Sequence, residues 1–353
     1  MVAAASRAAQ HPLHHANGPV SQVGSGKFSC VSERYLHDYT LDAAFTAQYL
    51  LGDELGCGGF GFVCSAIHRR SGVEVAVKFV LKRKIPSRGW VFDPLYRGGN
   101  ALPSEIAILR RLSHDNIVRF LDFYEDAVFF YVVTEYHGTP WATKTARLNA
   151  VPLMSPRVAS LQALDRPSLS QAIPCRRRSS CDLFECIEQH ERFTEMQAQR
   201  VFGQIVSAIY HLHSRGYVHR DLKDENCLVD RTFTVKLVDF GSAAPLPDGS
   251  RLFDRFLGTV QYAAPEILRG EKYRGPEAEV WALGCCLYIM LSGEVPFVAP
   301  AQALHGTFTP CRYPLSPACL HLLGRLLEKS DRRRITILEV VQHPWLRDYV
   351  TLV

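Results

Sequence analysis

The chain has 353 residues, 47% of them hydrophobic and 21% charged, which is typical of a globular protein that can bury a substantial core. Its formal charge of +5 is small beside 40 basic and 35 acidic side chains, so the composition gives no indication of nucleic-acid binding. The 11 cysteines show no C-x-x-C spacing, which indicates reduced thiols in the cytosol.

The longest apolar run, residues 280–291, is shorter than the ~20 residues that a membrane helix needs, and it predicts a buried core helix instead. We therefore expect no membrane partner. Because the cysteines indicate a reducing compartment, we expect a cytoplasmic protein, with the nucleus as an additional location.

Residues 1–48 show no sustained periodicity and contain many Gly, Ser, Pro and His residues, so they are predicted to form a disordered arm. A transit peptide is a weaker alternative, because the Ala/Ser/His-rich start carries Arg7 and no acid before Glu33. Ordered structure is expected to begin at Tyr49.

Residues 55–63 read L-G-C-G-G-F-G-F-V, a G-x-G-x-x-G-x-V pattern. The β-rich run at 73–78 that follows favours a hairpin over the strand-to-helix turn of a dinucleotide-binding fold. Glycines let backbone N–H groups approach phosphate oxygens, because no Cβ stands in the way. Lys78, at the end of V-A-V-K, is then expected to bind phosphate, although a lone strand lysine is usually just solvated.

A helix is predicted over residues 104–112, with apolar residues at 106, 109 and 112 on one face. Glu105 is the expected ion-pair partner of Lys78; the alternative is an exposed glutamate favoured by the helix dipole. An apolar strand at 129–135 follows and leads into a predicted hinge at 135–138.

The pattern breaks between Thr139 and Ser180, a stretch rich in Pro, Ser and Ala that ends in R-R-R-S-S. Structureless segments of this length are uncommon inside a compact domain. Three interpretations remain open: a disordered regulatory insert, a substrate-like segment that occupies the protein's own site or is phosphorylated there, and a translated intron.

Two further motifs lie at 217–226, Y-V-H-R-D-L-K-D-E-N, and at 239–241, D-F-G. They follow a long helical pattern at 193–213. Beyond them come Gly258-Thr259, the A-P-E motif at 264–266, and Arg334, which is expected to form a structural ion pair with Glu266. The loop after Ser242 contains Ser250 as its one hydroxyl residue before Leu257.

In this order and spacing, the motifs resemble those of the protein kinase superfamily over residues 49–348. The resemblance implies an α+β, two-lobe fold. It would comprise an N-lobe at 49–135, a hinge at 135–138, an insert at 139–180, a C-lobe at 181–348 and a tail at 349–353.

The resemblance also implies that ATP and Mg²⁺ are used, with Asp221 accepting the proton of a substrate hydroxyl and Lys223 beside the transferred phosphoryl group. Asn226 and Asp239 would hold Mg²⁺. The residues expected to contact ATP lie in the glycine-rich stretch, the neighbouring strands, the hinge and the start of the C-lobe: Leu55, Gly56, Cys57, Gly58, Gly59, Phe60, Gly61, Val63, Ala76, Lys78, Glu105, Thr134, Glu135, His137, Asp182 and Leu228.

The H-R-D-L-K sequence and Gly258-Thr259 resemble those of serine/threonine kinases. Within that group the chain is most similar to the kinase domain of PAS-domain-containing protein kinases, with the Pim kinases next. The matching segments are residues 102–106, 121–126, 182–184, 223–226, 239–244 and 273–277.

Such kinases are monomers that act on protein hydroxyls, generally at sites with upstream Arg or Lys, which Asp182, Asp224 and Glu225 are expected to recognise. Glu279 departs from the family's usual D-x-W motif. The alternative function is a pseudokinase that binds nucleotide as a scaffold, but Lys78, Asp221 and Asp239 are all present.

Overall fold

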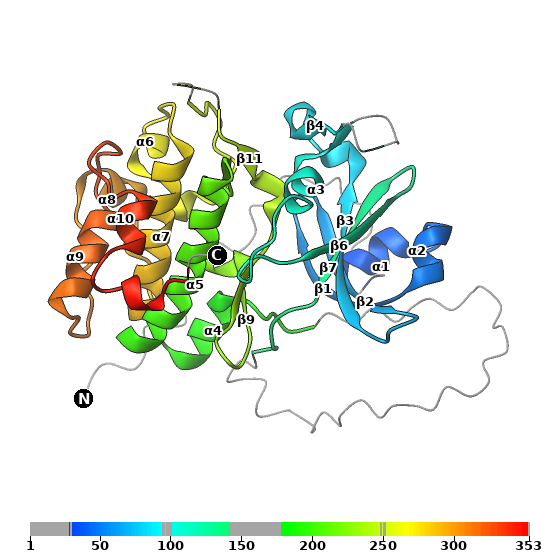
Figure 1. Cartoon of the computed structure of the whole chain (residues 1–353), viewed down its shortest axis with the longest axis horizontal. Coiled ribbons are helices and arrows are strands. Elements are labelled where there is room, and N and C mark those ends of the chain that lie inside the picture. The colour runs from blue at the N-terminus through cyan, green and yellow to red at the C-terminus, as the bar shows by residue number, and fades with distance from the viewer. Residues whose placement is uncertain are drawn as a thin grey trace.

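The N-terminal part of the protein is built on a five-stranded antiparallel sheet. The computed structural model describes residues 28, 30–93, 96, 101–141, 178–247, 249 and 252–351, which form a β-rich lobe and a helical lobe (Figure 1). The sheet has the order β1-β2-β3-β7-β6. Its strands are β1 (Tyr49–Gly58), β2 (Gly61–His68), β3 (Glu74–Leu81), β6 (Phe120–Glu125) and β7 (Phe129–Glu135). A small hairpin of β4 (Trp90–Phe92) and β5 (Ala101–Pro103) precedes helix α3 (Ser104–Leu109).

Two short helices cover one face of this sheet, α1 (Val31–Leu36) and α2 (Ala43–Gln48) (Figure 1). Phe45 of α2 is fully buried against Tyr49 and Tyr131, with ring centroids 5.4 and 5.1 Å apart. The prediction of a disordered arm is therefore wrong for residues 30–48. Such short helices produce too little periodicity to be detected, and packing against the aromatic face of the sheet stabilises them. Residues 1–27 and 29 lie outside the described part of the chain.

The helical lobe is organised around α7 (Gly275–Ser292), most of whose residues are buried. This confirms the buried core helix predicted for residues 280–291. The other helices of this lobe are α4 (Leu183–His190), α5 (Glu195–Ser214), α6 (Pro265–Leu268), α8 (Pro300–His305), α9 (Pro317–Leu326) and α10 (Ile337–Val341). Its short strands are β8 (Tyr217–Val218), β9 (Cys227–Val229), β10 (Val235–Leu237) and β11 (Ala244–Pro245). Within the described ranges, no helix has the length and apolar character required to span a membrane.

One buried ion pair connects distant parts of the helical lobe. The Arg334 guanidinium donates to both carboxylate oxygens of Glu266, at 2.8 and 2.9 Å, and to the carbonyl of Glu277 at 2.7 Å. The predicted structural pair is confirmed. It links the A-P-E motif to the loop before α10 and, through the carbonyl of Glu277, to α7.

The last described residues pack against α5. Ser207 donates a hydrogen bond to the carbonyl of Thr351, and a Cβ at Gly203 would lie 2.3 Å from the carbonyl oxygen of Tyr349. Residues 349–351 are therefore part of the folded lobe and not the separate tail that was predicted. A close backbone approach of this kind leaves no hydrophobic pattern in the sequence.

Candidate active site

Lys78 joins the two lobes at the centre of the site. Its Nζ atom lies 2.6 Å from Oε1 of Glu105 on α3 and 2.7 Å from Oδ1 of Asp239 in the helical lobe. The Lys78–Glu105 pair is thus confirmed. Burial alone would lower the ammonium pKa, but the charges of Asp239 and Glu105 outweigh it and raise the pKa of Lys78. The lysine is held as a cation.

The glycine-rich stretch is the turn between β1 and β2, so the hairpin interpretation is confirmed. Gly58 pairs with Gly61 across this turn, and Cys57, Gly58 and Gly59 are exposed. A Cβ at Gly61 would stand 1.8 Å from the carbonyl oxygen of Phe79, which explains why glycine is required there. The hairpin leaves its backbone N–H groups accessible to a phosphate.

Four strand residues predicted to contact ATP, Val63, Ala76, Lys78 and Thr134, lie on one face of the sheet. Val63 is paired with Lys78 and Ala76 with Thr134, and all four are partly exposed, whereas their neighbours along β3, Val75 and Val77, are buried. Alternation along a strand places successive side chains on opposite faces. The strands therefore present Val63, Ala76 and Lys78 on the face opposite the one covered by α1 and α2.

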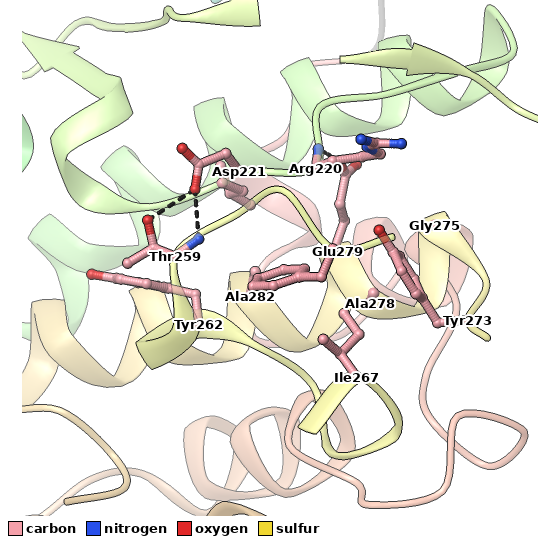
Figure 2. Close-up of a pocket in the computed structure, with 12 residues that line it drawn as sticks. Arg220, Asp221, Thr259, Tyr262, Ile267, Tyr273, Gly275, Ala278, Glu279 and Ala282 are labelled. Carbon is pink, nitrogen blue, oxygen red and sulfur yellow. Dashed lines mark hydrogen bonds between the residues drawn. The ribbon is translucent and has the colours of Figure 1, made fainter. Parts of the chain in front are cut away.

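Asp221 is oriented by contacts from two directions. Its Oδ1 accepts hydrogen bonds from Thr259 N at 2.9 Å and Thr259 Oγ1 at 3.0 Å (Figure 2). Asn226 donates through Nδ2 to the backbone carbonyl of Asp221 at 2.7 Å. Thr259 therefore connects the segment before A-P-E directly to the predicted catalytic base.

Glu279 supports the backbone beneath Asp221. Its Oε1 accepts from the N–H of Arg220 at 2.6 Å (Figure 2), and its Oε2 lies 2.7 Å from Nε2 of His213. Arg220 has φ 66°, a conformation that non-glycine residues seldom adopt without support. The Glu279 departure from the family pattern therefore retains a buried acceptor for the catalytic loop. His213 was missed, because a histidine at the end of α5 has no local motif.

Asp239 and Asn226 fit the requirements of a magnesium site. Chiefly because of Lys78, the pKa of Asp239 is lowered to about 2, so the carboxylate is charged at neutral pH. Since the Asn226 amide nitrogen donates to Asp221, its carbonyl oxygen remains as a possible ligand. Magnesium prefers such oxygen ligands and is commonly completed by substrate phosphates.

The three acids predicted to recognise substrate differ in accessibility. The Glu225 side chain is 42% exposed and pairs with Lys223 at 2.6 Å. Asp182 is partly exposed and caps α4, accepting from Glu185 N at 2.9 Å and from the hydroxyl of Ser180.

Asp224 does not fit the substrate-recognition prediction. It is 3% exposed and accepts a hydrogen bond from the Tyr262 hydroxyl at 2.7 Å. Its carboxylate turns inward because the short 3-10 helix at Asp224–Asn226 places it beneath Tyr262. The prediction is therefore wrong for Asp224 in this conformation.

The hinge positions follow β7, as predicted, but two of their side chains are already engaged. Glu135 pairs with Lys236 at 2.7 Å, and His137 Nε2 lies 3.0 Å from the carbonyl oxygen of Thr234. We expect Glu135 and His137 to contact the adenine of ATP through backbone groups, so these side-chain interactions do not conflict with the prediction. Leu228 of β9 forms a β-bridge with Asp182, so these two predicted ATP-contacting residues lie side by side.

The basic end of the insert bears on one of the three interpretations, in which the insert occupies the protein's own substrate site. Arg178 binds Asp53 and Glu74 of the sheet, at 3.1 and 2.7 Å, and not Asp182, Asp224 or Glu225. Arg178 therefore does not occupy the predicted substrate site. Residues 142–177, which include the other two arginines, lie outside the described part, as does Ser250.

The sequence matches the protein kinase domain family over residues 49–153 and 174–346, and the chain belongs to this family. Its members use ATP as substrate and Mg²⁺ as cofactor. The chain is 36% identical to the PAS domain-containing serine/threonine-protein kinase of Mus musculus, over 88% of this chain and 19% of that protein. It is also 36% identical to serine/threonine-protein kinase PSK2 of Saccharomyces cerevisiae, over 86% and 24% of the two chains.

A third relative, serine/threonine-protein kinase ppk6 of Schizosaccharomyces pombe, is 33% identical over 86% of this chain and 34% of its own length. The chain is thus a serine/threonine-type kinase domain of the two-lobe α+β fold, similar to PAS-domain-containing kinases. It spans only about a fifth to a third of the length of these relatives.

Proposed function

We propose that the protein transfers the γ-phosphate of ATP to serine or threonine hydroxyls of protein substrates, and that it prefers acceptors preceded by basic residues. The observation that carries the first part is Lys78, which bridges Glu105 and Asp239 at 2.6 and 2.7 Å. A scaffold that only binds nucleotide would not need Asp221 held by Thr259 and Asn226.

The chain's own residues supply positioning and charge. Lys78 would orient the α- and β-phosphates, and the hairpin of β1 and β2 would cover them with backbone N–H groups. Asp221, fixed by Thr259, would orient the acceptor hydroxyl and take its proton, while Lys223 would stabilise charge on the transferred group. Magnesium, held by Asn226 and Asp239, would neutralise phosphate charge.

The activity test compares two substitutions. Asp221→Asn removes the base but no nucleotide ligand, so ATP should bind nearly normally while phosphoryl transfer falls by roughly 10²–10⁴-fold. Asp239→Ala should instead abolish productive Mg-ATP binding. Both are measured by nucleotide titration and peptide phosphorylation, with catalytically silent Glu188→Gln as a surface control. Wild-type transfer by both active-site variants would refute the proposal.

The substrate preference rests mainly on Glu225, the most accessible of the three acids. An arginine upstream of the acceptor can form charge-assisted hydrogen bonds with this carboxylate. Glu225→Gln should therefore raise KM for a peptide with Arg two or three residues before serine more than it raises KM for a neutral peptide. Loss of the ion pair with Lys223 would affect both peptides alike, so the difference between them reports on substrate recognition. Glu188→Gln makes the same charge change on α4 and should not alter the preference. Equal rates for basic and neutral peptides with the wild-type enzyme would contradict the preference.

For the insert, a regulatory role and a translated intron remain alternatives. Trp141 N lies 3.2 Å from the carbonyl of Ser180, so the two ends of the segment meet. Residues 143–176 can therefore be deleted while Arg178 is kept. A regulatory segment predicts higher basal activity or a changed peptide KM after deletion; unchanged kinetics would exclude regulation. We also propose a monomer in the cytoplasm, with the nucleus as an additional location, to be checked by light scattering and imaging.

A further inference from the structure

Arg178 connects the end of the insert to the sheet of the N-lobe. Its Nε atom lies 3.1 Å from Oδ2 of Asp53, and its Nη1 lies 2.7 Å from Oε1 of Glu74. Its backbone N–H donates to the carbonyl of Glu54 at 2.9 Å. One residue thus contacts β1 immediately before the glycine-rich turn and also the first residue of β3.

Within three residues the same segment becomes part of the C-lobe. The carbonyl of Ser180 accepts from Trp141 N at 3.2 Å, and the carbonyl of Cys181 accepts from Val229 N of β9 at 2.8 Å. Asp182 then caps α4. Residues 178–182 therefore cross between the lobes, in addition to the crossing made by the hinge.

The two crossings are in contact. The hinge residue Gly138 has φ 97°, and a Cβ there would lie 2.5 Å from the Cβ of Cys181. The Tyr136 hydroxyl lies 3.9 Å from the sulfur of Cys181, and the Arg178 guanidinium is 6.0 Å from the centre of the Tyr136 ring. The segment therefore packs directly against the hinge.

We propose that Arg178 is a positioning residue that holds β1 and β3 close to the C-lobe and slows the release of nucleotide. This inference rests on the proposed function, because it concerns exchange of ATP and ADP at that site. Opening of the lobes, which many kinase-like enzymes require for product release, would have to break both ion pairs. It would also leave the carboxylates of Asp53 and Glu74 without their shared cation.

The expected change in the rate of nucleotide release depends on how far the three charged side chains are exposed to solvent. The side chains of Arg178, Asp53 and Glu74 are each about one third exposed, so solvent weakens each pair. Because one guanidinium forms two such pairs, we expect its removal to increase the rate of nucleotide dissociation about fivefold. Lysine keeps the charge but cannot form two directed contacts in the same way, so Arg178→Lys should be intermediate.

The experiment measures dissociation of a fluorescent ADP analogue from the full chain by stopped flow. We expect Arg178→Ala, and separately the double substitution Asp53→Asn with Glu74→Gln, to release ADP about fivefold faster than wild type. Adding Arg178→Ala to that double substitution should cause no further change. Arg347→Ala, which removes an exposed arginine elsewhere, should leave the rate unchanged.

The melting temperature of the nucleotide-free protein distinguishes a general loss of stability from faster ADP release. If Arg178 were purely structural, its substitution would lower the melting temperature and leave the rate of ADP release unchanged. Unchanged ADP release in both sets of variants, or effects that add fully, would overturn the inference. If wild-type protein bound no ADP at all, the proposed function itself would fail. If one variant does not fold, the other still tests the ion pairs.

Discussion

Asp224 provides a quantitative test of the structure, because the fold buries a carboxyl group that titrates near neutral pH. Burial is the main cause, and it raises the pKa of Asp224 from 3.8 to about 6, against the opposing hydrogen bond from Tyr262. A raised native pKa means that the folded state binds the proton more tightly than the unfolded chain does. The associated stability is fully present below about pH 4 and is lost as the pH rises through 6.

The expected magnitude follows from this difference of about two pKa units, which corresponds to about 3 kcal/mol in full. Between pH 5 and pH 7.5, the part that is lost amounts to about 1.4 kcal/mol. Asp224→Asn cannot titrate, so its free energy of unfolding should rise relative to that of wild type by this amount over the same interval. Any constant cost of the amide in this site cancels in the comparison.

The assay is urea unfolding, followed by tryptophan fluorescence, of both proteins at several pH values. Glu188→Gln, which replaces an exposed acid on α4, serves as the control for the loss of one carboxylate. If the difference between Asp224→Asn and wild type is constant within about 0.3 kcal/mol over this interval, the carboxyl group does not have the raised pKa that its burial implies.

Three other outcomes are expected. The Arg220 guanidinium lies 4.9 Å from the centre of the Phe253 ring, which gives this cation a partner other than a phosphate. Phosphatase-treated protein should therefore keep most of its kinase activity, whereas Phe253→Ala should lose much of it; a collapse of activity after phosphatase treatment would contradict this. Phe45→Ala should lower the free energy of unfolding by about 3–5 kcal/mol, and a cost below 1 kcal/mol in denaturant titration would show that α2 is dispensable. Glu266→Ala should cost about 3–5 kcal/mol because it leaves the charge of Arg334 buried, and wild-type stability in the same titration would contradict this.

The chemistry of the site was predictable because each part of it is encoded locally. The glycine-rich turn requires residues without a side chain at fixed positions in one short stretch. Asp221 and Asn226 likewise belong to a single short loop. Lys78 and Glu105 belong to different elements, but a buried cation requires an anionic partner and the first turn of the next helix supplied one. Short-range backbone geometry and charge pairing therefore sufficed to predict the glycine-rich turn and the ion pair, and the resemblance to protein kinases implied the roles of Asp221 and Asn226.

Contacts between residues far apart in the chain decided which segments are ordered and which side chains are accessible. Phe45 is ordered by aromatic rings of strands that follow it, and Glu279 reaches His213 and Arg220 from another helix. The accessibility of Asp224 depends on Tyr262 in a segment beyond the catalytic loop. The local sequence does not specify these distances, because burial and partner choice arise only when the lobes pack. The sequence alone thus predicted which groups carry the chemistry, whereas tertiary packing decided which of them are held, covered or left accessible.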